Sequence, residues 1–394
     1  HEPPPSPRLK SDAIDVAWES AILRCLERKP EARFASAGAA VAAIDAAGRS
    51  LVVWENDFNG LQARFFNRSG QPAGAELNLA ANRLLPSIPA RGDVITQEDP
   101  ALAFLPSGDF FVFWTQEKAF LTVDIFIETR EIQDRDVVGQ RFNRNGQPVG
   151  SRFRVNAQAA GLQSNPRVVA RANNLVVVWQ SPDGVFGRRV GFNGNLLGDE
   201  IQLAGAGAQS PNVAADSAGN FLVVWDAADA SGSEVFGQLL DRTGALTGSS
   251  FRISSDTVGN QRAASVAAGR DGSFFVVWHG QTDSPRHARV FGQAVGAGGN
   301  LIGAQVTVSS ATFVKEVAPT VAAGRDGRFL VTWLAYDETF PRGYYGVEIS
   351  TQGALSGTEV KLNRRAINAN TRTEIGADGK GQFVIPWEGF FVRQ

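Results

Sequence analysis

The chain has 394 residues, of which 43% are apolar and 20% are charged. A chain of this length can hold about two or three ordinary domains, or one large closed one. The net charge of −2 gives no electrostatic reason to expect nucleic acid or an anionic membrane surface as a partner. The single cysteine, Cys25, excludes an internal disulfide framework. No apolar stretch approaches the roughly 18 residues of a membrane span.

Residues 1–35 differ in character from the rest of the chain. They open with the linker-like HEPPPSPR, after which Ser11 offers an N-cap to a helix. The apolar residues of this predicted helix recur every four positions: Ile14, Trp18, Ile22 and Leu26. We expect the helix to stop by Lys29, because Pro30 follows.

The stretch AILRCLERKPEARFASA (21–37) resembles the closing element of a bacterial serine/threonine protein kinase domain, and the resemblance extends over residues 11–37. The family's arginine at the position of Arg33 pairs with a glutamate of the activation segment, so the resemblance implies a structural role for Arg33. The Gly-rich loop, the lysine and the two aspartates that kinases need are absent, so no phosphotransfer is expected. The alternative is a generic amphipathic helix that caps the fold.

From residue 36 onward the chain repeats. Each repeat contains a strand-like apolar run that ends in tryptophan, such as FFVFW, LVVVW and FLVVW. The seven repeat tryptophans, to which we assign a structural role, are Trp54, Trp114, Trp179, Trp225, Trp278, Trp333 and Trp387. An upstream aliphatic run, a downstream run such as VFGQLL, a Gly-x-x-x-Gly turn and an alternating run complete the unit. Four short strands with such turns predict an antiparallel meander.

The residue types along the four predicted strands favour a β-propeller. The first strand is small and apolar, the second is apolar on both faces, and the fourth alternates between apolar and polar residues. This gradation suits blades that converge on an axis, with a half-solvated strand at the rim. We therefore expect an all-β, seven-bladed β-propeller with a short N-terminal α-helical segment. An open β-solenoid of the same unit is the alternative.

We assign residues 1–35 to a linker and helix, and residues 36–394 to the propeller. The expected blades are about 36–84, 85–164, 165–210, 211–261, 262–317, 318–372 and 373–394. The last blade lacks its fourth strand, so we expect the natural protein to continue beyond Gln394.

The connections from the second to the third strand vary in length, and they share one face with the connections between blades. We call this the long-loop face and predict that recognition occurs there. Residues 116–136 form the longest connection, which alternates like a protruding hairpin. The candidate binding residues on these connections are Phe120, Ile125, Ile127, His279, Asp283, His287, Tyr336, Asp337, Tyr344 and Tyr345.

The same connections carry acidic residues. Glycoside hydrolysis needs two carboxylates that face a cleft, and Glu117, Asp136, Asp226 and Asp337 lie in suitable places, although the sequence does not pair them. The spacing of His279, Asp283 and His287 matches no standard ligand motif, so no metal is expected. No cofactor is expected, and no catalytic residue is assigned.

These observations predict a non-catalytic module that binds an unidentified protein or small ligand on its long-loop face. The kinase resemblance implies the sensor or interaction module of a bacterial kinase-like protein. It also implies a cytoplasmic location, whereas without a genuine kinase segment we expect an extracytoplasmic one. The alternatives are a secreted or cell-surface propeller that binds a glycan or a protein, and a hydrolase that uses the long-loop face.

Overall fold

The computed structural model describes residues 39–56, 59–83, 90–123, 128–158, 161–171, 173–229, 232–255, 259–281, 287–310, 313–324, 327–337, 341–363, 372–378 and 382–386. These residues form β-strands and no α-helix. Within them, no helix has the length and hydropathy that crossing a membrane requires. The predicted N-terminal helix and Arg33 lie outside the described residues and stay predictions, as does the kinase resemblance.

In each of the first three blades four strands pair antiparallel in chain order, and a strand of blade 7 joins the edge of the blade 1 sheet in parallel. Blade 1 comprises β1 (Ala39–Ile44), β2 (Ser50–Asn56), β3 (Gly60–Phe66) and β4 (Leu77–Ala80). Blade 2 comprises β5 (Ala90–Phe104), β6 (Phe110–Val123), β7 (Glu128–Phe142) and β8 (Pro148–Arg154). Blade 3 comprises β9 (Ser164–Arg171), β10 (Asn174–Ser181), β11 (Gly184–Gly191) and β12 (Leu196–Ala204).

The remaining blades repeat this order. Blade 4 comprises β13 (Ala208–Ala215), β14 (Phe221–Asp229), β15 (Gly232–Leu240) and β16 (Leu246–Arg252). Blade 5 comprises β17 (Gln261–Ala268), β18 (Phe274–Gln281), β19 (Ala288–Val295) and β20 (Leu301–Thr307). Blade 6 comprises β21 (Lys315–Ala323), β22 (Arg328–Tyr336), β23 (Pro341–Ser350) and β24 (Val360–Lys361). The described part of blade 7 comprises β25 (Arg372–Thr373), β26 (Gly376–Ala377) and β27 (Phe383–Val384).

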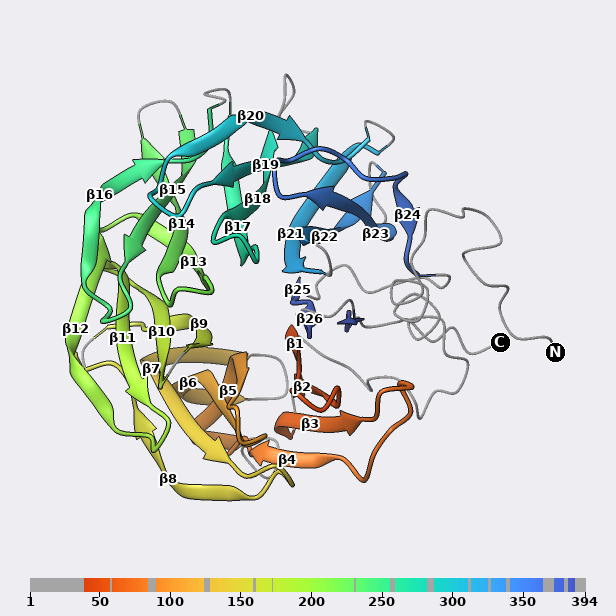
Figure 1. Ribbon diagram of the computed structural model, residues 1–394. Coiled ribbons are helices and arrows are strands. Elements are labelled where there is room, and N and C mark those ends of the chain that lie inside the picture. The colour runs from red at the N-terminus through yellow and green to blue at the C-terminus, as the bar shows by residue number, and fades with distance from the viewer. Residues whose placement is uncertain are drawn as a thin grey trace.

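The blades form a closed ring, with β1 beside β25 and β26 where its two ends meet (Figure 1). In the part of the chain that the structure describes, seven hydrophobic cores hold the ring, and each contains residues of two successive blades. The closing core joins Trp54 of blade 1 to Val384 of blade 7. An open solenoid would leave its end repeats uncovered, so the predicted seven-bladed propeller is confirmed.

The repeat tryptophans explain this pairing of blades. The six that the structure describes are at most 3% exposed, and each lies in the core that its own blade shares with the preceding blade. The second strand of a blade is covered on both sides by neighbouring blades, which is why it is apolar on both faces. The outer strand β8, by contrast, is mostly exposed. Trp387 lies outside the described residues.

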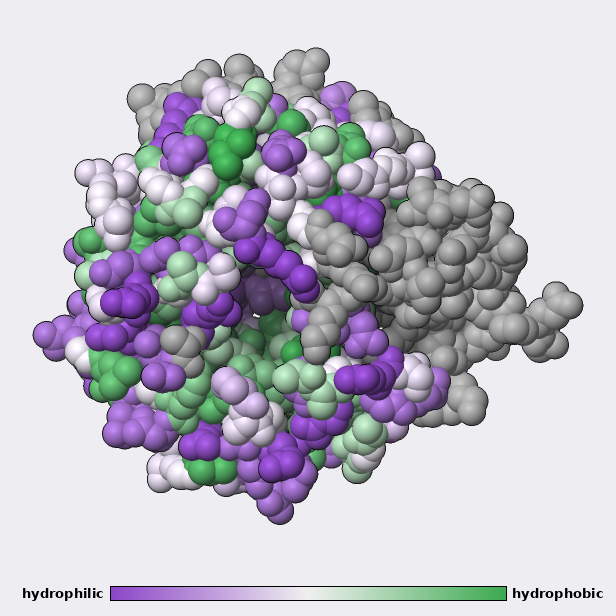
Figure 2. All heavy atoms as spheres, viewed as in Figure 1, coloured by the Kyte–Doolittle hydropathy of each residue, from purple (hydrophilic) through white to green (hydrophobic). Residues whose placement is uncertain are grey.

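An ion pair crosses the centre of the ring. Arg167 of β9 approaches Glu374, which lies between β25 and β26, with 2.5 Å between Nε and Oε1. Blades 3 and 7 are not neighbours, so the pair spans the central channel and links the two halves of the ring. A hollow marks the centre of the face shown in Figure 2.

Candidate functional site

A strained residue recurs within the first strand of five blades. Its φ is positive although it is not glycine, and the pairing with the second strand shifts register beside it. These residues are Asp99 (50°), Asn165 (57°), Ser210 (53°), Ala263 (54°) and Ala318 (50°). Such backbone conformations persist only where the surroundings hold them.

The strained backbone is held in part by a hydrogen bond to the preceding blade. The acceptor is the side chain of the residue that follows the repeat tryptophan of that blade. Thr115, Gln180 and Asp226 each accept the N–H of the strained residue in the next blade at 3.1 Å. Glu55 of blade 1 accepts the N–H of Asp99 of blade 2 in the same way. The repeat thus builds a set of polar contacts between blades on the long-loop face.

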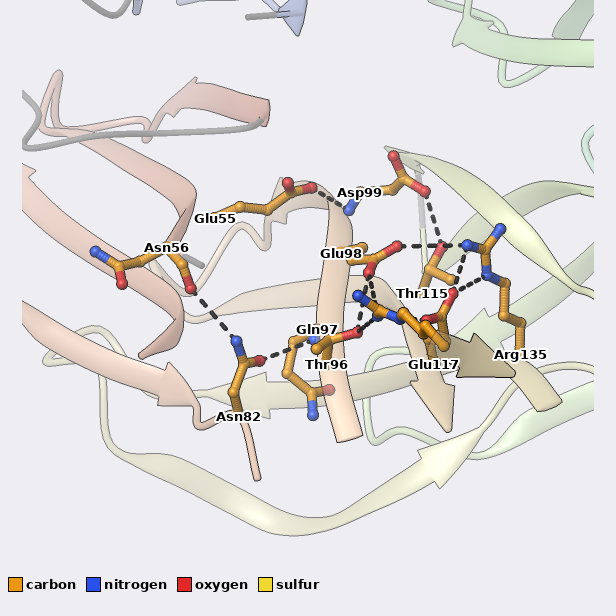
Figure 3. A network of polar contacts seen from close by, with 11 residues as sticks. Glu55, Asn56, Asn82, Thr96, Gln97, Glu98, Asp99, Thr115, Glu117 and Arg135 are labelled. Carbon is orange, nitrogen blue, oxygen red and sulfur yellow. Dashed lines mark hydrogen bonds and ion pairs between the residues drawn. The ribbon is translucent and has the colours of Figure 1, made fainter. Parts of the chain in front are cut away.

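At the junction of blades 1 and 2 this set carries three carboxyl groups. Glu55 is the second-last residue of β2, while Glu98 and Asp99 lie at the bulge of β5 (Figure 3). All three residues are half-buried, so their carboxyl groups are not cut off from solvent. The hydroxyl of Thr115 donates to Oδ2 of Asp99 at 3.1 Å. Acidic side chains from two blades therefore converge at one place.

An ion cluster around a buried glutamate supports these residues from blade 2. The strands β5, β6 and β7 are 15, 14 and 15 residues long, and their long-loop ends form a three-stranded extension. Within it Glu117 is 1% exposed and pairs with both Arg130 and Arg135. The same arginines approach Glu98, at 3.5 and 3.9 Å. Glu117 is thus enclosed by its partners, whereas Glu98 is open on one side.

The environment of Glu98 favours its protonated form. Burial raises the pKa of its carboxyl above the usual value, and the nearby charges of Glu117 and Asp99 raise it further. The hydroxyl of Thr96, which donates to Oε1 at 2.9 Å, and the charge of Arg135 lower this pKa but do not cancel the shift. Glu98 therefore keeps its proton to higher pH than an ordinary glutamate.

The structure separates the binding residues predicted in blades 2 and 5. Phe120 lies half-buried on the blade 2 extension, and Ile125, Ile127 and Asp283 lie outside the described residues. His279 belongs to β18 rather than to a loop, and His287 is exposed just before β19. No group of three or more metal-ligating side chains occurs in the described part of the chain.

The predicted tyrosine loop of blade 6 is largely strand. Tyr336 ends β22, and Tyr344 and Tyr345 pair with Leu334 and Trp333 in the β22–β23 hairpin. Tyr344 is buried at 2% exposure, whereas Tyr345 packs on Phe313 with 4.8 Å between ring centroids. Neighbouring residues of a strand point to opposite faces, so the three tyrosines do not form one surface. Asp337 forms an ion pair with Arg342.

The remaining acidic residues predicted from the sequence have partners of their own. Asp136 accepts a hydrogen bond from Asn156 at 2.7 Å. Asp226 is fully buried beside Ala263, and burial raises the pKa of its carboxyl. Glu117, Asp136, Asp226 and Asp337 therefore do not meet in one cleft.

No protein-family model and no curated protein matches the sequence, whereas solved structures match the fold. A protein of unknown function from Dyadobacter fermentans is 13% identical, with a TM-score of 0.52, over 74% of this chain and 93% of that chain. An α-L-arabinofuranosidase from Fusarium graminearum is 11% identical, with a TM-score of 0.44, over 82% of this chain and 92% of that chain. An endo-arabinase from Bacteroides thetaiotaomicron is 12% identical, with a TM-score of 0.37, over 64% of this chain and 92% of that chain.

The hypothesis of a non-catalytic sensor module attached to a kinase-like protein is contradicted. Solved structures of similar fold include an arabinofuranosidase, an endo-arabinase and a protein named as a glycoside hydrolase. The expectation that the chain is not an enzyme is contradicted by the same finding. At 10–13% identity these likenesses show the fold alone, so an activity has to be argued from the side chains of this chain.

Sequence reasoning missed Glu55, Glu98 and Asp99. The bulge that gathers them is marked by a proline after the strained residue in four blades: Pro100, Pro166, Pro211 and Pro319. This recurring X-Pro, about 15 residues before each tryptophan, was the signal that could have identified the position.

Proposed function

We propose that the chain is a glycoside hydrolase that works from its long-loop face, with Glu98 as the proton donor and Asp99 as the second carboxylate. The observation that carries this proposal is the convergence of half-buried carboxyl groups at the blade 1–2 junction, one of which has a raised pKa. Glycosidases need such a pair, one carboxyl protonated and one ionised.

The contrast between blades favours chemistry at this junction over a purely structural role. The strained position is a scaffold feature, and it carries no acid in the four other blades that show it, where it is Asn165, Ser210, Ala263 or Ala318. The residues before it there are Ser164, Gln209, Arg262 and Val317. Blade 2 alone among these five blades has acidic residues at both positions, so the fold does not require them.

The residues divide the reaction between them. Glu98 donates its proton to the glycosidic oxygen as the bond from that oxygen to the anomeric carbon breaks. The Asp99 carboxylate, steadied by the Thr115 hydroxyl, faces the positive charge that develops on the sugar ring. Glu55 is a positioning residue, because it holds the backbone N–H of Asp99. Glu98 regains its proton when water completes the hydrolysis.

A substrate screen tests the proposal. The purified chain is incubated with arabinan, xylan, other plant and bacterial polysaccharides, and nitrophenyl glycosides, and new reducing ends or nitrophenol are measured. The arabinan and xylan are included because the enzymes with similar folds are named for them. We expect hydrolysis of at least one substrate, which Asp99→Asn abolishes. Asp183→Asn, at an exposed turn of blade 3, is the matched control and leaves the rate unchanged.

The pH profile gives a second prediction. The rate should fall at high pH as Glu98 loses its proton, and this fall should come at a higher pH than for an ordinary glutamate. Thr96→Ala removes a hydrogen bond that lowers the Glu98 pKa, so the alkaline limb of kcat/KM should move to still higher pH. A limb that moves to lower pH, or does not move, contradicts the role of Glu98.

The kinase resemblance of residues 11–37 has no part in this proposal. It concerns residues outside the described structure, and the solved structures do not support it.

A further inference from the structure

A buried glutamine holds the repeat tryptophan in three blades. It lies two residues before the strained position, and its side-chain oxygen accepts the indole N–H of the tryptophan in the same blade. Gln97 accepts from Trp114 at 2.5 Å, Gln163 from Trp179 at 3.2 Å, and Gln261 from Trp278 at 3.0 Å. We call this contact the glutamine clasp.

Blade 6 has Glu316 in place of the glutamine. Glu316 pairs with Ala335, two residues beyond Trp333, as Gln97 pairs with Gln116, two residues beyond Trp114. The backbone thus offers the same contact, but the Glu316 side chain points elsewhere. Its Oε2 accepts the Ser309 hydroxyl and lies 3.6 Å from Nη1 of Arg289, and both partners belong to blade 5.

The change of direction leaves two buried atoms without partners. Among the described residues, neither Oε1 of Glu316 nor Nε1 of Trp333 has a hydrogen-bond partner, although both side chains are fully buried. An unsatisfied buried polar group is costly. A second arrangement is therefore available to Glu316, in which its carboxyl group accepts the indole N–H of Trp333. In that arrangement the side chain no longer contacts blade 5.

The place of Glu316 makes this choice relevant to how two blades join. Blades 5 and 6 share one continuous sheet through parallel pairing of β19 and β21, where Ala288 faces Lys315. Arg289 also donates to the backbone oxygen of Phe313 at 2.6 Å, just before β21. The Glu316 contact thus reinforces the junction at which blade 6 begins.

The carboxyl of Glu316 changes charge near neutral pH. Burial raises its pKa to about 7, against the lowering effect of the Ser309 hydroxyl and of Arg289. The Glu359 carboxylate raises it further, and Arg289 and Glu359 are the described charged groups that act on it. A neutral carboxyl group has no net attraction to Arg289, and its carbonyl oxygen can accept an indole N–H as the glutamine does.

We propose that Glu316 is a proton-controlled contact between blades 5 and 6: as a carboxylate it holds Arg289 and Ser309 of blade 5, and as a neutral acid it turns to clasp Trp333 in its own blade. Acidification then weakens the contact between blades 5 and 6 and forms the hydrogen bond between Glu316 and Trp333 within blade 6. Alkaline conditions do the reverse. The inference is independent of the hydrolase proposal, because none of these residues belongs to the carboxyl cluster of blades 1 and 2.

Indole N–H resonances of the full chain, labelled with ¹⁵N tryptophan, test this directly. The Trp333 resonance, assigned by its loss in Trp333→Phe, should move as pH rises through about 7, with the hydrogen-bonded shift on the acid side. Glu316→Gln should keep it at the hydrogen-bonded shift at every pH, as for Trp114 and Trp278. In Arg289→Gln the transition should move to higher pH, because the charge that favours the carboxylate is gone.

Two results would overturn the proposal. One is a Trp333 resonance that stays constant across this range while the protein remains folded. The other is a transition at the same pH with and without the Arg289 charge. The second comparison does not require Glu316→Gln to fold, so the proposal can be tested even if that variant is unstable.

Melting temperature provides a further check. Because the folded-state pKa of Glu316 lies above its ordinary value of 4.5, the wild-type chain should lose stability relative to Glu316→Gln as pH rises from 4.5 to about 7. The two should melt alike below this range, and Glu316→Gln should melt higher above it. If the melting temperature of the wild-type chain instead rises relative to that of Glu316→Gln as pH increases, the proposed switch is contradicted.

Discussion

Replacing Trp278 with alanine is expected to lower the free energy of unfolding by about 3–5 kcal/mol. The side chain is fully buried, it belongs to the core between blades 4 and 5, and its indole N–H is bound by Gln261 at 3.0 Å. The substitution removes the largest side chain of that core and leaves Gln261 without its partner. Guanidinium unfolding followed by circular dichroism measures the loss as a lower midpoint.

Two further variants separate the contributions. Trp278→Phe keeps most of the ring but removes the N–H, so it should cost less than Trp278→Ala. Leu246→Ala truncates a side chain that is 51% exposed on β16 and should change stability by less than about 0.5 kcal/mol. If Trp278→Ala costs no more than Leu246→Ala, the core between blades 4 and 5 does not depend on its tryptophan.

Glu98→Gln is expected to lower kcat by about 10²–10⁴-fold on a substrate with a poor leaving group, because the proton donor is lost. The amide fills nearly the same space and can still accept from Thr96, so the fold should be retained. The loss should be much smaller on a dinitrophenyl glycoside, whose leaving group departs without a proton. Steady-state kinetics on the two substrates measures the difference.

The dependence on leaving group is the outcome that distinguishes a proton donor from a structural residue. A residue that only supports the site would, when replaced, reduce both rates by the same factor. Equal losses on both substrates would therefore assign Glu98 a supporting role, with Glu117, in the Arg130–Arg135 cluster. Asp183→Asn again controls for the loss of a carboxylate on the same face.

The four-strand unit and its seven copies could be predicted from residues close together in the sequence. The second strands, whose apolar runs end in Trp114, Trp179, Trp225 and their equivalents, are apolar on both faces because both faces are covered, whereas the fourth strands alternate because one face meets solvent. Each strand has the same number of buried faces in every copy, so the same apolar pattern recurs along the sequence and is easy to detect. The extension of blade 2 was predicted in the same way, from the alternation between residues 116 and 136.

The candidate site could not be predicted in this way, because it depends on contacts between copies. Glu55 and Asp99 are 44 residues apart and meet only because Asp99 lies at a bulge that faces the preceding blade. Glu98 looks like any strand residue in the sequence, and its raised pKa results from burial next to Glu117.

The sequence by itself therefore determined the architecture of this protein: an all-β ring of four-stranded blades, each marked by an apolar run that ends in tryptophan. Only the tertiary structure decided which polar side chains meet across the blade junctions, such as Glu98 with Arg135 and Glu316 with Arg289. The physical reason is one of range. The apolar pattern that marks each strand can be read from residues close together in the sequence. The protonation and direction of a buried carboxyl group depend instead on charges and dipoles that the folding of the ring brings close.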